Sequence, residues 1–139
     1  MSGAAQGLAG SLAFHHAAMS VPDIEAAAQW YEDVLGFRVE RRFAIPGGTQ
    51  AMFLEREGLR IELFQVADPR PMPVERLDPR EDLKTLGNKH AAFTVADYDG
   101  FRADLIARGI EPVLEVGEAF GRGLFIRDGA GNVIEFLER

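Results

Sequence analysis

Apolar and polar residues alternate along four short stretches in the first half of the chain, and a fifth stretch has helical spacing. Alternation is typical of β-strands with one buried face, and it predicts strands at about 15–21, 38–45, 50–56 and 59–66. Between the first two strands, apolar residues recur at the spacing of a helix: Ile24, Ala27, Ala28, Tyr31, Val34 and Leu35. Asp23 suits the N-cap of this helix and Gly36 its left-handed end. The predicted order is strand, helix and three strands.

The second half of the chain repeats the first. Residues 16–23 read His-Ala-Ala-Met-Ser-Val-Pro-Asp and residues 90–97 read His-Ala-Ala-Phe-Thr-Val-Ala-Asp, with five of eight positions identical. Gly36 precedes Glu62 by 26 residues, and Gly109 precedes Glu135 by the same number. An internal repeat of this kind indicates a duplicated structural unit. We therefore predict an α+β fold of two βαβββ modules, residues 14–66 and 88–138, within a single domain, residues 14–139.

The segments outside the modules have different compositions. Residues 1–13 are rich in Gly, Ala and Ser without Lys or Arg, so we interpret them as a flexible leader rather than a secretory signal, and we expect a cytoplasmic location. Residues 67–87 contain four prolines and many charges, which favours a surface linker. The turn from Asp128 to Asn132, with two glycines, predicts a hairpin in the second module.

Composition excludes several functional classes. The chain has 139 residues and no cysteine, so disulfides, thiolate metal sites and a cysteine nucleophile are excluded. A net charge of −7 disfavours binding to nucleic acid. No apolar run approaches the roughly 20 residues of a membrane span. A small molecule is the expected partner.

Strand parity places four metal-binding side chains on matching faces. Side chains alternate across a strand, and one parity set is apolar and should pack against the helices: Met19, Val21, Ile61, Leu63, Phe93, Val95, Ile134 and Phe136. The other face carries His16, Glu62, His90 and Glu135 among the small residues Ala18, Ser20, Ala92 and Thr94. Two imidazoles and two carboxylates suit one Ni²⁺, Co²⁺, Zn²⁺, Fe²⁺ or Mn²⁺ ion. His15 has the opposite parity and no counterpart, so we interpret it as structural.

The sequence resembles the vicinal oxygen chelate superfamily over about residues 15–137. The resemblance rests on these segments: His16 with 21–23, Trp30-Tyr31 with 34–37, Ile61-Glu62-Leu63, His90 with Val95 and Asp97, and Asp128-Gly129 with 131–135. It implies an open, cupped sheet around a metal, substrates that chelate the metal through adjacent oxygens, and a homodimer. Whether each site lies within one chain or is shared by two stays open.

The ligand set is similar to that of bacterial glyoxalase I, and methylmalonyl-CoA epimerases resemble it with Gln in place of Glu62. Ser20 and Val66 stand where bacterial glyoxalases I commonly hold the glutathione carboxylate with Arg and Asn, which argues against glutathione. The resemblance therefore implies a metal-dependent lyase, isomerase or epimerase, with Glu135 or Glu62 moving a proton next to a carbonyl.

Two alternatives stay open at this point. An Fe²⁺ extradiol-type ring-cleaving dioxygenase would use His16, His90 and Glu135, and a non-catalytic binder of the antibiotic-resistance (bleomycin) type would only sequester a small molecule. Arg60 shares the parity of Glu62 and is a candidate for an anionic substrate group. The candidates for an apolar substrate pocket are Phe43, Phe53, Phe64, Phe120 and Phe125.

Overall fold

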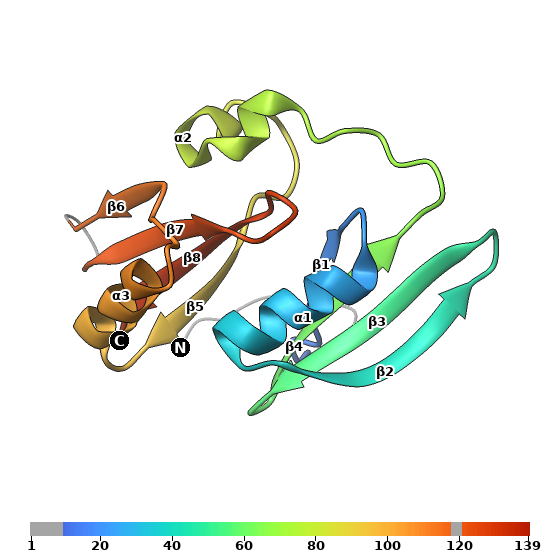
Figure 1. Ribbon diagram of the computed structural model, residues 1–139, viewed down its shortest axis with the longest axis horizontal. Helices are drawn as coiled ribbons and strands as arrows, with labels where there is room; N and C mark the ends of the chain where they lie inside the picture. Colours follow the sequence, from blue (N-terminus) through green and yellow to red (C-terminus); the bar gives the residue numbers. More distant parts are fainter. Residues whose placement is uncertain (1–9, 118–120) are drawn as a thin grey trace.

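A computed structural model describes residues 10–117 and 121–139. The first module contains β1 (Ala17–Ser20), α1 (Ile24–Leu35), β2 (Arg38–Ile45), β3 (Thr49–Arg56) and β4 (Leu59–Gln65). The second contains β5 (Ala91–Val95), α3 (Tyr98–Ala107), β6 (Leu114–Val116), β7 (Gly123–Arg127) and β8 (Val133–Glu138). The two modules lie beside each other, each with one helix (Figure 1). The predicted βαβββ repeat is confirmed.

A capping side chain and a glycine set the two ends of helix α1. The Asp23 side chain accepts a hydrogen bond from the backbone N–H of Ala26, and Gly36 ends the helix with φ of 71°. A left-handed φ favours glycine because a side chain would be strained there. Helix α3 repeats the pattern, since Asp97 caps it through Gly100 N–H and Gly109 follows it with φ of 77°.

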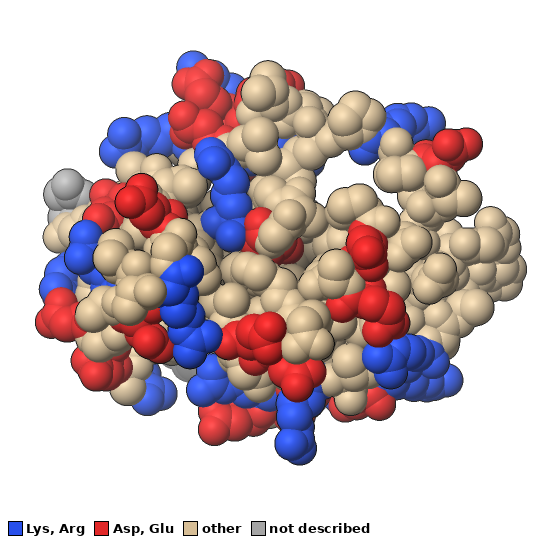
Figure 2. Space-filling model, in the orientation of Figure 1, with Lys and Arg blue, Asp and Glu red and all other residues tan. Residues whose placement is uncertain are grey.

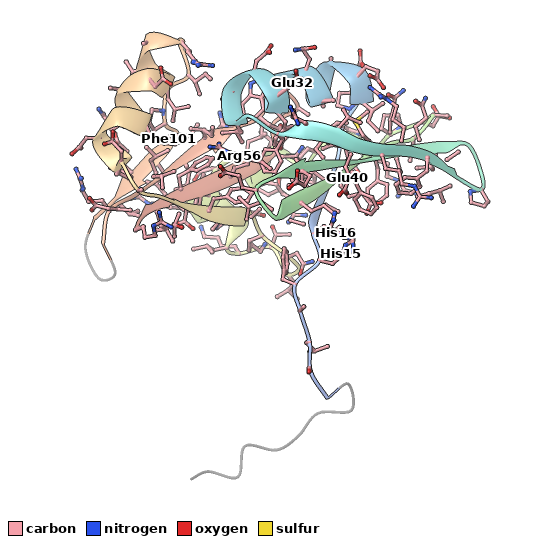
Figure 3. All side chains as sticks on the ribbon, turned by 90° about the horizontal axis from the view of Figure 1, so that it is seen from below. His15, His16, Glu32, Glu40, Arg56 and Phe101 are labelled. Carbon is pink, nitrogen blue, oxygen red and sulfur yellow. The ribbon has the colours of Figure 1, made fainter. Side chains whose placement is uncertain are left out.

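The strands form two mixed four-stranded sheets with the same topology, in the orders β1-β4-β3-β2 and β5-β8-β7-β6. In each sheet the first strand of the module runs parallel to the last strand of the module, β1 beside β4 and β5 beside β8. This pairing places Ala18 opposite Glu62 and Ala92 opposite Glu135. Both helices lie on the same side of the two sheets (Figure 3). The side chains that parity assigned to the helix face belong to the core or pack against it. The opposite face of each sheet is therefore free to hold the predicted polar residues.

Side chains from both modules form one hydrophobic core, and three hydrogen bonds also join the modules. The Tyr31 hydroxyl in α1 donates to Asp128 Oδ2 in the turn before β8, at 2.7 Å. Asn132 donates to the Ser20 carbonyl at 3.3 Å, and Arg108 to the Asp33 carbonyl at 2.6 Å. The two modules therefore pack against each other through a shared core and polar contacts. Within the described residues, no helix is long and apolar enough to cross a membrane.

The segment between the modules is more structured than its composition suggests. It contains the 3-10 turn η1 (Val74–Leu77) and the short helix α2 (Pro79–Asp82), and both Pro79 and Asp82 are buried. Two ion pairs with Asp82, described below, tie α2 to the start of β5. The sequence interpretation of residues 67–87 as a plain surface linker missed these contacts. Most of the predicted leader lies outside the described residues.

Candidate metal centre

The first pair of predicted ligands is in contact. His16 Nε2, just before β1, lies 3.0 Å from Glu62 Oε1 in β4. The His16 side chain is 29% exposed and that of Glu62 is 10% exposed, so the imidazole shields the carboxylate from solvent. The Phe53 ring in β3 packs edge-on against the His16 ring, with centroids 5.2 Å apart. The first module thus supplies one imidazole–carboxylate pair on an aromatic support.

The second module builds the same arrangement. His90 Nε2, just before β5, lies 3.0 Å from Glu135 Oε1 in β8, and the side chains are 22% and 12% exposed. The Phe125 ring in β7 packs edge-on against His90 at 5.0 Å. In the ladders, Phe53 is opposite Glu62 and Phe125 is opposite Glu135. Equivalent registers therefore produce two equivalent half-sites, each made of His, Glu and Phe.

Both histidines line one cleft of about 1540 Å³. Residues of β1, β5, the linker and the turn before β8 form its walls. The two carboxylates are not part of the lining and lie behind their imidazoles. Among the residues that the structure describes, no three His, Asp or Glu side chains form one ligand group. The structure thus places the four predicted ligands in two separate pairs, and only the histidine of each pair lines the common cleft.

His15 lies against the first half-site. Its Nδ1 is 2.6 Å from His16 Nδ1, and its ring packs on Phe53 at 5.7 Å. Figure 3 shows His15 and His16 together on the face opposite the helices. The alternation argument for His15 is wrong because β1 begins at Ala17, and side chains outside a strand need not alternate. His15 therefore contacts the imidazole of the first half-site.

The predicted substrate residues have varied positions. Arg60 lines the cleft, but it donates two hydrogen bonds to Glu40 at 2.8 and 3.0 Å, so its charge already has a partner. Phe43 packs on Phe53 at 5.3 Å rather than on the cleft. Phe64 is half-buried in β4 beside Ser20, also outside the cleft lining. Phe120 lies outside the described residues.

A family model matches residues 13–136, which include both half-sites, and its description reads Glyoxalase/Bleomycin resistance protein/Dioxygenase superfamily. The chain belongs to this superfamily. The resemblance seen in the sequence is therefore confirmed. A comparison with curated protein sequences finds no match.

Several solved structures share the fold over nearly the whole chain. The structure of SMU.1112c is 28% identical with a TM-score of 0.71, covering 91% of this chain and 98% of that one. A glyoxalase family protein from Enterococcus faecalis is 26% identical with a TM-score of 0.75, covering 91% and 97%. The fosfomycin resistance protein FosX from Listeria monocytogenes, in a complex with Mn(II), is 15% identical with a TM-score of 0.63, covering 90% of each chain. FosX is similar in fold alone.

The half-sites of this superfamily member suit a divalent cation. A buried carboxylate is costly unless it is paired or bound to a cation. Within the described part of the chain, Glu62 and Glu135 each have one polar partner, a histidine Nε2. Imidazole nitrogen and carboxylate oxygen together suit first-row divalent metals. Each half-site therefore offers donor types that suit such a cation, while the two half-sites stand as separate pairs among the described residues.

An ion-pair cluster beside the second half-site was missed by sequence reasoning. Asp82 of α2 accepts hydrogen bonds from Arg76 at 3.0 Å and from Lys89 at 3.3 Å. Lys89 also donates to the backbone carbonyls of Asp82 and Thr85. Because Lys89 directly precedes His90, the cluster fixes the start of β5. Nothing in the local sequence pairs these charges, since the contacts depend on how the linker folds back.

Replacing Asp82 with asparagine should destabilise the protein by about 2 kcal/mol at neutral pH. Burial raises the pKa of Asp82, but hydrogen bonds from Lys89 and Arg76 outweigh this and lower the pKa below the ordinary value of 3.8. Because the pKa of Asp82 is lower in the folded protein than in the unfolded chain, the ionised carboxylate stabilises the fold. This stabilisation is fully present at pH values above the pKa in the unfolded chain, and it is lost as the pH falls through the pKa in the folded protein. Urea unfolding should therefore show a large difference between the variant and the wild type at pH 7.

The difference should shrink as the pH falls below 3.8 and through the lowered pKa of Asp82, where its carboxylate takes up a proton. Glu81→Gln is the matched control, because Glu81 is an exposed neighbour whose ion pair with Lys84 should add little. A loss of stability in Asp82→Asn that stays the same throughout an acid titration from pH 7 would contradict the role of the charge.

Proposed function

We propose that this protein is a metal-dependent lyase, isomerase or epimerase that moves a proton next to a carbonyl of a metal-chelating substrate. One observation carries the proposal: equivalent His–Glu pairs, each with an Nε2–Oε1 distance of 3.0 Å, stand in both modules beside one cleft. In this proposal His16, Glu62, His90 and Glu135 hold one divalent cation. The cation supplies Lewis acidity, which stabilises negative charge on the substrate oxygens.

The chain's own residues supply the remaining chemistry. Each imidazole must turn its Nε2 lone pair toward the cleft, and its carboxylate is then released from the present 3.0 Å contact. A released Glu135 or Glu62 carboxylate can accept a proton from the carbon beside the substrate carbonyl and return it to a neighbouring position. Phe53 and Phe125 hold the imidazoles from behind and keep water from that side. The substrate reaches this site through the cleft.

Proton exchange in D₂O, followed by NMR, tests the proposal. The protein is loaded in turn with Ni²⁺, Co²⁺, Zn²⁺, Fe²⁺ and Mn²⁺, and is given 2-oxoaldehyde adducts of thiols and acyl thioesters. We expect exchange at the carbon beside the carbonyl with at least one metal, and loss of exchange after chelation. Removing the carboxylate that moves the proton, by Glu135→Gln or Glu62→Gln, should slow exchange by about 100-fold or more at equal metal content.

Three outcomes contradict the proposal. Absence of exchange with every metal and substrate removes the proton-transfer chemistry. Oxygen consumption with catechols by the Fe²⁺-loaded protein, without exchange, favours ring cleavage instead. Unchanged ligand affinity in both glutamine variants, together with absent exchange, favours a binding protein.

A further inference from the structure

The cleft carries a local excess of positive charge. Its lining includes four cationic side chains and a single acidic one: Arg60, Arg70, Arg76 and Lys89 against Asp82. The whole chain has a net charge of −7, and acidic and basic side chains intermingle over the face in Figure 2. Glu62 and Glu135 stand behind the histidines, where the proposed cation balances them. The excess therefore belongs to the cleft and its rim.

Three of these four cations already have acidic partners. Arg60 forms a two-pronged ion pair with Glu40, and Arg76 and Lys89 share Asp82. Arg70 is exposed, and among the described residues its side chain has no hydrogen bond or ion pair. Its guanidinium is thus available to a ligand in the cleft.

The backbone around Arg70 is stiff. Prolines stand on both sides of it, at 69 and 71, and Pro73 follows. Proline fixes its own φ and holds the preceding residue in an extended conformation, and Pro73 itself has φ of −56° and ψ of 136°. This segment arches away from β1 and β4 in Figure 1, and Figure 2 shows an opening beneath it. Arg70 is therefore held at the rim without contacts that a ligand would need to break.

Apolar side chains also line the cleft. Met72 and Val66 belong to its linker side, and Val133 begins β8. A ligand that spans the cleft from Arg70 to the histidines therefore meets apolar side chains. An arginine fork binds carboxylate or phosphate oxygens through two parallel hydrogen bonds.

We propose that Arg70 binds the anionic group, a carboxylate or a phosphate, of a substrate whose other end presents oxygens to His16 and His90. This inference rests on the proposed function for the metal-facing end of the substrate. The substrate class is an anionic carbonyl compound with an apolar segment between the carbonyl and the anion.

Calorimetry with matched hydroxamates tests the proposal, because a hydroxamate offers two adjacent oxygens to a metal. Three probes of equal chain length end in a carboxylate, a phosphonate or a neutral carboxamide. With the Zn²⁺-loaded protein, we expect at least one anionic probe to bind about tenfold more tightly than the carboxamide. Arg70→Ala should abolish this preference and leave affinity for the carboxamide unchanged. Arg80→Ala, which removes an exposed linker arginine outside the cleft lining, should retain it.

A second arm separates failure of this inference from failure of the metal site. Hexylphosphonate and hexanoate, which lack the hydroxamate, are added to metal-free protein, and the side-chain N–H signals of Arg70 are followed by NMR. A shift of those signals supports the anion site even if no hydroxamate binds the metal-loaded protein. Equal affinity for all three hydroxamates, an anion preference that survives Arg70→Ala, or no shift with either alkyl anion would overturn the inference.

Discussion

Replacing Glu135 with alanine is expected to lower the affinity of the protein for Ni²⁺ or Zn²⁺ by at least about 100-fold. Changing a group that only orients a metal ligand commonly costs 10- to 100-fold, so removing a proposed ligand should cost more. The same result is expected for Glu62→Ala, because Glu62 occupies the equivalent ladder position in the first module. Titration of the metal-free protein against a chromophoric chelator measures the affinity.

The matched control is Glu138→Ala, three residues along the same strand. Glu138 is exposed and pairs with Arg122, away from the cleft. Its replacement should leave the metal affinity within about twofold of the wild type, since distant surface substitutions rarely perturb a site. A second control, His15→Ala, should weaken binding by roughly tenfold or less, because His15 contacts His16 without reaching the proposed cation. Equal metal affinities in Glu135→Ala and Glu138→Ala would remove Glu135 from the ligand set.

Replacing Asp128 with alanine is expected to lower the free energy of unfolding by about 4 kcal/mol. The buried Asp128 carboxylate accepts hydrogen bonds from the Tyr31 hydroxyl, the backbone N–H groups of Ala130 and Asn132, and the Asn132 side chain, all within 3.0 Å. In the alanine variant the Tyr31 hydroxyl keeps Met19 Sδ and the Asn132 side chain keeps the Ser20 carbonyl, but the backbone N–H groups of Ala130 and Asn132 lose their acceptor. Each unsatisfied buried donor is costly. Since a domain of this size has only about 5–15 kcal/mol in total, the loss should be plain in urea unfolding.

Tyr31→Phe separates the contact between modules from the turn. It removes the 2.7 Å bond from α1 to Asp128 and the contact of the hydroxyl with Met19 Sδ, and it leaves the turn intact, so a smaller loss of about 1–2 kcal/mol is expected. The pKa of Tyr31 is raised by burial and by the Asp128 carboxylate, so the hydroxyl stays protonated and donates throughout the ordinary pH range. Asp104→Ala, at an exposed aspartate of α3, should change stability by less than about 0.5 kcal/mol. If Tyr31→Phe costs nothing, the bond between Tyr31 and Asp128 does not stabilise the contact between the modules.

Much of the fold could be predicted from the sequence because local features mark where its elements begin and end. Strand β2 and helix α1 were predicted within one or two residues because a cap, a glycine and a period of apolar residues mark them from within. Alternation along β4 and β8 also placed Glu62 and Glu135 on the faces away from the helices, since it is a local rule. His16 and His90 each stand one residue before their strand and reach the same faces through their contacts with these carboxylates. The internal repeat supported these predictions because equivalent residues occur at equivalent positions in both modules.

The aromatic supports show where a usable signal was overlooked. Phe53 precedes Glu62 by nine residues and Phe125 precedes Glu135 by ten, so both belong to the repeat. Antiparallel pairing then places each ring opposite its carboxylate and against its histidine. The sequence interpretation named both as pocket residues but did not use this equivalence. The one-residue difference lies in the turn, where insertions are tolerated.

The sequence by itself determined the two βαβββ modules, the strand faces and the four candidate ligands, because these follow from local periods and from duplication. Only the tertiary structure decided that Arg60 is paired with Glu40, while Arg70 has no partner within the described chain. It also decided that Asp82 anchors the linker beside His90. Finally, it decided that the four candidate ligands stand as two separate pairs. The physical reason is that an ion pair or a ring contact forms between residues far apart in the chain. Which charges find partners therefore depends on how the linker and the two modules pack in space.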